Sequence, residues 1–435
     1  MVITQPNRPG AAPQSSGRGL SRAPDLPERV RPAPDWYGRS TTAVLRTYEV
    51  AVRVVSDRRA ANPLRGRSFL LMLLAVLGGF AGYVLLLPVV PLWAVVGGAG
   101  EIAAGATNAV FMLVTVLTQL AMPWLLRRVG HRLALGAGTL LIGLPTPLFA
   151  VSQEMWALLA VSGLRGIGFG LLTVAGSALV AELVPVAMRG RAAGLYGLSV
   201  GLPNVVFLPA GVWLAQHVGF VPLFWIATAL PVAMTAAVFW IAPVRRPEAG
   251  PAAARTFPLT LFSPWLVMCV VATAAGGLVA FLPLAITAWA VTPALLSFGL
   301  ATVAGRWLAG QVGDRFGGGL VVVPSVVLAG AGTAAIALAS AGAAAVAIAG
   351  AFALGAGFGA VQNVTLVMMF ERAESGAAST AWNIAYDAGN GIGAVGFGVL
   401  VTATDYPTTF GAMAAVVLAF TSLAIADQRG RARSR

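Results

Sequence analysis

A short polar stripe interrupts a long apolar stretch near the C-terminal end of the chain. Asn383, Asp387 and Asn390 follow the spacing i, i+4, i+7, which places them on one face of a helix. A carboxylate in apolar surroundings can take up and release a proton, and the flanking amides can hydrogen-bond to a small polar molecule. We therefore predict that Asp387 is a proton-coupling site. The alternative is a structural hydrogen bond from Asp387 to a neighbouring helix.

Two arginines also stand deep within apolar sequence. Arg165 can neutralise a carboxylate, bind an anionic group of a substrate or tune the proton site. It can equally form a purely structural bridge between helices; we predict Arg165, together with Asp387, as a proton-coupling candidate. Arg306 stands two turns before Asp314, and we interpret it mainly as an organiser of a gate.

Uncharged polar and aromatic side chains at similar depths are candidates for lining a substrate cavity. Two of the polar candidates, Asn108 and Gln119, share one helix face with Thr115. Each candidate can instead form a helix-helix hydrogen bond or simply pack, which is the more ordinary role. The cavity candidates are Asn383, Asn390, Tyr386, Trp382, Gln362, Asn363, Asn108, Gln119, Asn204 and Tyr83.

The sequence carries no constellation typical of an enzyme. It lacks a Gly-x-x-x-x-Gly-Lys phosphate-binding motif, a cluster of metal ligands, and a nucleophile with a paired base. The single cysteine, Cys269, cannot form a disulfide within the chain. We therefore expect a protein that is not an enzyme and that uses no cofactor and no metal.

The elements that position these residues are long apolar segments. The chain is 58% apolar and only 10% charged, with a mean hydropathy of +0.84. A segment of roughly 20 apolar residues crosses a ~30 Å hydrocarbon core as a helix. The sequence predicts an all-α membrane protein with twelve transmembrane helices, at 69–96, 104–126, 133–152, 155–183, 192–216, 220–242, 261–290, 292–312, 318–340, 343–369, 376–402 and 407–427.

The arginines alternate between the two sides of this predicted bundle. The six connections on one side hold no arginine, whereas those on the other side hold Arg127, Arg128, Arg132, Arg189, Arg191, Arg245, Arg246, Arg255, Arg315 and Arg372. Since positive charge near span ends marks the cytoplasmic side, both termini are predicted to be cytoplasmic, in a bacterial inner membrane. This bias accounts for the net charge of +13. No recognition module accompanies the charge, so we expect no nucleic-acid partner.

The remaining segments are tails and a linker. Residues 1–38 are rich in proline and arginine and are predicted to be a disordered cytoplasmic tail. Residues 39–66 contain an amphipathic helix, which lies on the cytoplasmic leaflet or packs on the cytoplasmic loops. We predict six-helix halves at 67–242 and 259–428, a linker at 243–258 and a basic tail at 429–435.

The two halves repeat the same landmarks. Gly82 precedes Pro88 by the same interval as Gly277 precedes Pro283. The tripeptide Gly168-Phe169-Gly170 is followed by Glu182, and Gly357-Phe358-Gly359 by Glu371, again at equal spacing. A duplicated six-helix unit is the architecture of many secondary transporters, with the substrate bound between the halves.

Three motifs resemble those of the major facilitator superfamily. Residues 310–317, Gly-Gln-Val-Gly-Asp-Arg-Phe-Gly, resemble its loop signature G-x-L-a-D-r-x-G. Residues 165–170, Arg-Gly-Ile-Gly-Phe-Gly, loosely resemble an arginine-glycine pattern of proton-coupled members, although Phe169 stands where a glycine is usual. Glycines and prolines at 194–211 resemble an antiporter signature, with Gly201-Leu202-Pro203 in place of an adjacent Gly-Pro pair. The resemblance covers about residues 69–427 and is nearest to sugar-efflux and drug-efflux members.

The resemblance also implies a cytoplasmic gate. In the first half the family's aspartate is replaced by Arg127, ahead of Gly130, while Glu371 and Glu374 precede the eleventh span. We hypothesise a charge-swapped latch between Arg127 and Glu374 or Glu371; the alternative is that Arg127 is only an orienting positive charge. The expected gate residues are Gly310, Asp314, Arg315, Gly317, Arg306, Arg127, Gly130, Glu371 and Glu374.

These patterns together favour a secondary transporter. We predict export of a drug-like or sugar-like small molecule in exchange for protons, by a monomer in the lipid bilayer that moves by alternating access. One alternative is an importer or facilitator of a metabolite with the same fold. Another is a membrane protein without transport activity that recruits partners through its N-terminal helix.

Overall fold

The computed structural model describes residues 63–185, 188–243, 259–316, 319–339, 343–373 and 375–434. Within these ranges the chain is helical and contains no strand. The predicted tail 1–38, most of the predicted amphipathic helix 39–66 and nearly all of the linker 243–258 lie outside them.

The helices fall into two sets of six membrane spans. The first set comprises α2 (Arg67–Leu86), α3 (Val89–Val96), α4 (Glu101–Val129), α5 (His131–Gly143), α6 (Met155–Leu183), α7 (Arg189–His217) and α8 (Phe220–Phe239). The second comprises α9 (Phe262–Ala285), α10 (Ala288–Phe316), α11 (Gly319–Ala339), α12 (Ala344–Phe370), α13 (Ser375–Ala403), α14 (Tyr406–Ala419) and α15 (Thr421–Ser434). Short 3₁₀ helices lie at Pro63–Arg65, Thr146–Ala150 and Leu259–Leu261.

The prediction of twelve spans is confirmed. Among the described residues, twelve helical segments are long and apolar enough to cross a membrane. Most predicted boundaries lie within about four residues of the observed ones, but the seventh span ends at Ala285 rather than at residue 290. The last helix continues to Ser434, through most of the segment that we predicted as a tail.

The first span is broken where the sequence places two prolines close together. Helix α2 ends at Leu86 and α3 begins at Val89, with Pro88 between them. Proline lacks an N–H group, so Pro88 and Pro91 each remove a helical hydrogen bond. At the repeat position in the second half, Pro283 lies inside the last turn of α9 and causes no such break.

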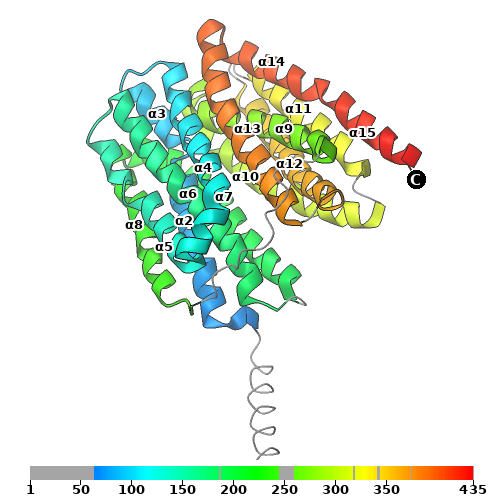
Figure 1. Ribbon diagram of the computed structural model, residues 1–435. Helices are drawn as coiled ribbons and strands as arrows, with labels where there is room; N and C mark the ends of the chain where they lie inside the picture. The colour runs from blue at the N-terminus through cyan, green and yellow to red at the C-terminus, as the bar shows by residue number, and fades with distance from the viewer. Residues whose placement is uncertain are drawn as a thin grey trace, which may run out of the picture. The chain divides into compact units, whose positions relative to one another are not determined.

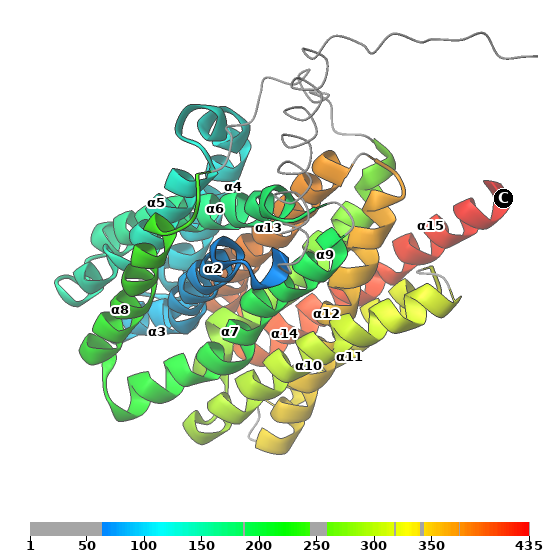
Figure 2. The ribbon, with the colours of Figure 1, turned by 90° about the horizontal axis from the view of Figure 1, so that it is seen from below.

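The two sets of helices form two bundles that lie side by side. Figures 1 and 2 show the first set, blue to green, on one side and the second set, light green to red, on the other. The main contacts between the bundles join α4 to α13 and α7 to α10, with a smaller contact between α3 and α9. Any site shared by both halves must therefore lie along these helices.

Glycines at repeat positions allow equivalent close helix packing in the two halves. A Cβ added at Gly168 of α6 would lie 2.8 Å from the carbonyl oxygen of Gly138 on α5. A Cβ added at Gly357 of α12 would lie 2.6 Å from the carbonyl oxygen of Ser325 on α11. Small residues let backbones approach closely in membrane bundles. The internal repeat seen in the sequence thus appears again in the packing.

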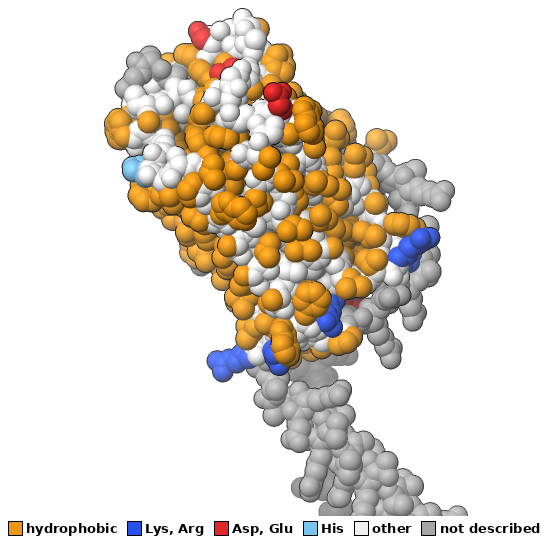
Figure 3. Space-filling view, turned by 90° about the vertical axis from the view of Figure 1, so that its left-hand side faces the viewer, with side chains coloured by type: hydrophobic (Ala, Val, Ile, Leu, Met, Phe, Trp, Pro, Cys, Tyr) orange, Lys and Arg blue, Asp and Glu red, His pale blue; other side chains and the backbone are white. Residues whose placement is uncertain are grey.

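The outer surface is apolar in the middle and charged at the ends. In Figure 3, hydrophobic side chains cover most of the visible face, with acidic side chains toward one end and arginines toward the other. Tryptophans such as Trp156, Trp225 and Trp307 are more than half exposed. An apolar girdle of this kind is what a lipid-facing surface requires.

Candidate transport site

Asp387 lies where the two halves meet, at the contact between α13 and α4. Its side chain is only 3% exposed. The amide Nε2 of Gln119 on α4 donates a hydrogen bond to Asp387 Oδ2 at 2.7 Å. Within the described residues Asp387 forms no ion pair. A buried carboxylate whose hydrogen-bond donor comes from the opposite half is placed to respond to movement between the halves.

Gln119 has a second partner in its own half and an unused acceptor. Its Nε2 also donates to Thr173 Oγ1 on α6, at 3.4 Å. The Thr173 hydroxyl itself donates to the carbonyl oxygens of Phe169 and Gly170. The other amide atom, Gln119 Oε1, is buried and has no hydrogen-bond partner among the described residues. The sequence pointed to Gln119 but carried no sign of Thr173.

Aromatic rings pack on both sides of this polar pair. In the first half Tyr83 stacks on Phe169, with ring centroids 4.1 Å apart, and on Phe111 at 5.1 Å. In the second half Tyr386 stacks on Trp382 at 5.5 Å and on Phe358 at 5.7 Å. Thus Tyr83, Trp382 and Tyr386, which we predicted as cavity walls, are held in two ring clusters.

The α4 and α13 helices remain in close contact from Asp387 to the end marked by Glu101. Added Cβ atoms at Gly391 and Gly398 would lie 2.9 Å from Met112 Cβ and 2.6 Å from the Glu101 carbonyl oxygen. At the end itself, the hydroxyl of Tyr406 donates to Glu101 Oε1 at 2.6 Å. The halves are therefore closed together at the Glu101 end.

Glu101, at the first turn of α4, is held in the contact between the halves. Its Oε1 bonds Tyr406 of the other half, and its Oε2 is buried without a partner among the described residues. The Tyr406 side chain at the start of α14 covers the Glu101 carboxylate. Tyr406 carried no sequence signal that would have paired it with Glu101.

Along α7 and α10 the contact between the halves fades toward the opposite end. An added Cβ at Gly299 of α10 would lie 2.9 Å from the Asn204 carbonyl oxygen, and one at Gly201 would lie 3.8 Å from Val303. Added Cβ atoms at Gly197 and Gly194 would have no described neighbour within 4 Å. The halves thus separate toward the end where α7 begins.

Arg165 binds backbone carbonyls of two helices. Its Nε donates to the carbonyl oxygen of Ile142 on α5 at 3.0 Å, and one terminal nitrogen donates to Gly82 O on α2 at 2.8 Å. The guanidinium carbon lies 5.9 Å from the centroid of the Phe111 ring and 5.7 Å from that of Phe149. Within the described residues Arg165 forms no ion pair. These contacts join α2, α5 and α6 and favour the structural bridge over the predicted proton-coupling role of Arg165, which stays untested.

Asn108 donates a hydrogen bond to a backbone carbonyl at the break in the first span. Its Nδ2 donates to the carbonyl oxygen of Leu87 at 2.8 Å. In a continuous helix that oxygen would accept from residue 91, but Pro91 has no N–H group. The amide of Asn108 therefore replaces a missing helical hydrogen bond, a role that spacing on α4 alone did not reveal.

The other polar candidates divide into two groups. Three amides donate to carbonyls one turn earlier on their own helices: Asn383 to Ser379, Asn390 to Tyr386 and Asn204 to Val200. Gln362, Asn363 and Trp382 instead form contacts between α10, α12 and α13. Arg306 donates to Gln362 Oε1 at 3.3 Å, and Trp382 Nε1 donates to Thr365 Oγ1 at 3.1 Å. An added Cβ at Gly310 would lie 3.3 Å from Asn363 Nδ2.

The predicted gate is described only in part. Gly130 has φ +79° between α4 and α5, a conformation that favours glycine. The side chains of Arg127 and Glu371 are exposed. The backbones of Asp314 and Arg315 lie at the end of α10, while their side chains, together with Gly317 and Glu374, fall outside the described part of the chain. The proposed latch stays a hypothesis.

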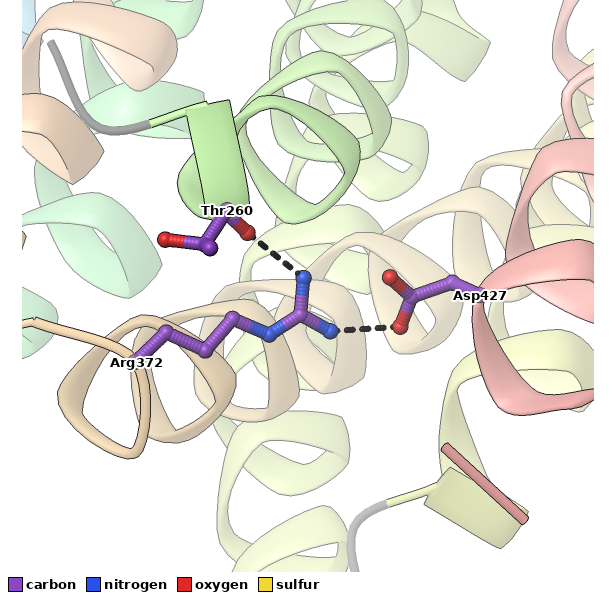
Figure 4. A network of polar contacts seen from close by, with 3 residues as sticks. All are labelled: Thr260, Arg372 and Asp427. Atoms are coloured by element: carbon purple, nitrogen blue, oxygen red, sulfur yellow. Dashed lines mark hydrogen bonds and ion pairs between the residues drawn. The ribbon is translucent and has the colours of Figure 1, made fainter. Parts of the chain in front are cut away.

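A charged contact in the second half was not anticipated from the sequence. Arg372, just after α12, forms an ion pair with Asp427 of α15 at 2.5 Å and donates to the Thr260 carbonyl oxygen at 2.8 Å (Figure 4). The two side chains are 15% and 13% exposed. The pair joins three segments that lie far apart in sequence, which a sequence-based account cannot connect.

Comparison with known proteins decides the family. The family model described as Major Facilitator Superfamily matches residues 69–394. The chain belongs to this superfamily. Two curated relatives, both uncharacterised MFS-type transporters of Mycobacterium tuberculosis strains, are 34% identical over 101 residues. That stretch is 23% of this chain and only 15% of the length of either relative.

Solved MFS structures share the fold. A bacterial homolog of the human lysosomal transporter Spinster, inward-facing and unoccupied, aligns with TM-score 0.65 and 14% identity over 85% of this chain and 97% of its own. The nucleoside transporter NupG aligns with TM-score 0.65 and 12% identity over 82% and 99%. At these identities the likeness shows the fold alone. The chain is thus a member of the major facilitator superfamily whose described part holds twelve candidate membrane spans.

Proposed function

We propose that this MFS transporter exports a small organic molecule in exchange for protons. The observation that carries the proposal is Asp387, a buried carboxylate with no ion-pair partner among the described residues, placed at the contact between the halves. Intramembrane carboxylates are costly and commonly mark proton or substrate pathways. Exchange of substrate for protons follows if the proton and the substrate bind the same site in turn.

The proposed orientation places the arginine-rich end in the cytoplasm. Arg127, Arg128 and Arg132 lie at the junction of α4 and α5, and positive charge near span ends is typical of the cytoplasmic side. The Glu101 end, where the halves are closed, then faces outward. In this orientation the open space beside Gly197 and Gly194 would face the cytoplasm, the side from which a substrate for export is loaded.

In this proposal the two ring clusters and Asp387 define the kind of substrate. The clusters around Tyr83 and Tyr386 present apolar and aromatic surface, and polar groups are few. Such surroundings, with few charged groups, suit an uncharged drug-like or sugar-like molecule. Import of a metabolite by the same fold is the second candidate. We also propose that the protein works as a monomer in a bacterial inner membrane.

The test separates coupling from transport. Proteoliposomes would be assayed with a panel of drugs, sugars and amino acids, both for accumulation driven by a pH gradient and for exchange of labelled against unlabelled compound. We expect Asp387→Asn to abolish the driven accumulation and to retain exchange, because exchange needs no proton release. Glu154→Gln is the matched control, since Glu154 is an exposed carboxylate at the start of α6. Driven accumulation that survives in Asp387→Asn would refute the assignment.

A further inference from the structure

The side-chain amide of Gln119 can face Asp387 in two orientations, with either its nitrogen or its oxygen toward the carboxyl group. A primary amide has a donor end and an acceptor end, whereas an ionised carboxylate only accepts. With Asp387 ionised, Nε2 must face it, because the reverse orientation would set two acceptors against each other. The observed 2.7 Å contact from Nε2 to Oδ2 has this arrangement. It leaves Gln119 Oε1 buried with no described partner.

A protonated Asp387 changes which orientation is favourable. Its carboxylic acid has an O–H donor, and the orphaned Oε1 is the acceptor that can receive it. A rotation of about 180° about the terminal side-chain bond exchanges the two ends of the amide. In the rotated form Oε1 gains the Asp387 donor that it lacks in the ionised state, whereas Nε2 gives up its bonds to Asp387 and Thr173.

We propose that Gln119 is a positioning residue that reports the proton state of Asp387 by amide rotation. In the ionised state it donates to Asp387 and to Thr173; in the protonated state it accepts from Asp387 and no longer donates to Thr173. The proton comes from hydronium in the aqueous pathway and returns there, and no other bond is made or broken. The proposal rests on the proposed proton-coupled function.

This rotation would link the second half to α6 of the first half. Thr173 Oγ1 lies on α6, whose Gly170 packs against Thr118 and Thr115 of α4. In both proton states Gln119 keeps one hydrogen bond to Asp387, so the contact between α4 and α13 survives protonation. What changes is the hydrogen bond from Gln119 to α6. Protonation would thus be signalled within the first half without breaking the contact between the halves.

The other titratable and charged groups around Asp387 do not take the place of Gln119 as its hydrogen-bond donor. Asp387 acts electrostatically on Tyr83 of α2 and Tyr386 of α13, and these tyrosines also interact with Arg165 and Arg306. Cys269 lies on α9, which packs against α13. The charged side chains of α4 stand near its two ends, at residues 101, 127 and 128.

The test is an infrared pH titration of the purified protein in lipid. The carbonyl stretch of protonated Asp387 is identified as the band that Asp387→Asn removes. We expect Gln119→Met, which keeps the volume but cannot donate, to move the midpoint of that band about one pH unit higher, because the ionised form loses a charge-assisted donor and the protonated form only a neutral one. Thr173→Val should move it in the same direction by less. Thr118→Val is the control, since its hydroxyl bonds only the Val114 carbonyl of its own helix.

A second readout follows the amide directly. With ¹³C-labelled glutamine, the side-chain carbonyl band that Gln119→Met removes should shift as Asp387 protonates, because Oε1 gains a donor. A purely structural Gln119 would show no such shift. An Asp387 band with an unchanged midpoint in Gln119→Met, or a Gln119 carbonyl band that is independent of pH, would overturn the rotation. Absence of any Asp387 band in the wild type would instead overturn the proposed proton coupling itself.

Discussion

Replacing Gly398 with alanine should push the two halves apart at the Glu101 end. A Cβ at this position would lie 2.6 Å from the Glu101 carbonyl oxygen and 2.9 Å from Ile102 Cα. Both are backbone atoms, so no side chain can rotate away. Ordinary contact begins near 3.4 Å, and α4 and α13 must therefore separate by roughly 0.8 Å.

The magnitude follows from the cost of overpacking. Inserting a methyl group into a well-packed contact costs about 1–3 kcal/mol. If this cost falls only on the state closed at the Glu101 end, it changes the equilibrium between closed and open forms about 5- to 150-fold. Gly396→Ala is the matched control on the same helix, because a Cβ there meets no described atom within 4 Å. The general gain in helix propensity from glycine to alanine is common to both variants.

The assay measures the distance between spin labels at the Glu101 end. Labels at Glu154→Cys and Thr404→Cys report on opposite halves from exposed positions, in a background where the buried Cys269 is replaced. We expect a larger long-distance population in Gly398→Ala than in Gly396→Ala. Identical distance distributions in the two variants would refute the reasoning that this contact closes the halves.

Three further predictions concern single contacts. Asn108→Leu should lower the free energy of unfolding by about 1–3 kcal/mol, because it leaves the buried Leu87 carbonyl without its donor; thermal melts in detergent would check this against a Thr118→Val control. A double-mutant cycle with Arg372→Gln and Asp427→Asn should give a coupling energy of about 1–2 kcal/mol, and a value near zero would contradict a stabilising ion pair. Hydrogen bonds from Thr408 lower the pKa of Asp405 in the folded protein. The ionised Asp405 therefore stabilises the fold above its unfolded pKa, and this stabilisation is lost as pH falls through the folded pKa. Asp405→Ala should be less stable than the wild type at neutral pH and should approach it below about pH 4, as thermal melts across pH would show.

The sequence predicted the fold well because membrane spans are a local signal. The length of each apolar segment predicts a membrane span without knowledge of the other segments, and the repeated glycines divide the twelve predicted spans into two halves. Local sequence does not predict where a span is interrupted. The first span breaks at Pro88, whereas a lone proline such as Pro283 lies within α9 without interrupting it. Whether a proline breaks a span depends on nearby donors and acceptors that the sequence does not place.

The candidate site was predictable in part. Asp387 and Gln119 each stand out as polar residues within apolar spans, but their 2.7 Å contact joins helices 268 residues apart in sequence. The carbonyl partners of Arg165 and Asn108 are backbone atoms, which leave no trace in residue types. Pairings across the two halves, such as Tyr406 with Glu101, arise only from the tertiary packing.

The central claim is that Asp387 couples proton movement to substrate movement. The most direct measurement is proton flux across proteoliposomes on addition of a transported compound, followed with a pH-sensitive dye in the wild type, Asp387→Asn and Glu154→Gln. The account predicts substrate-dependent proton flux in the wild type and in Glu154→Gln, and none in Asp387→Asn, although that variant still exchanges the compound. Substrate-dependent proton flux of equal size in all three proteins would contradict it.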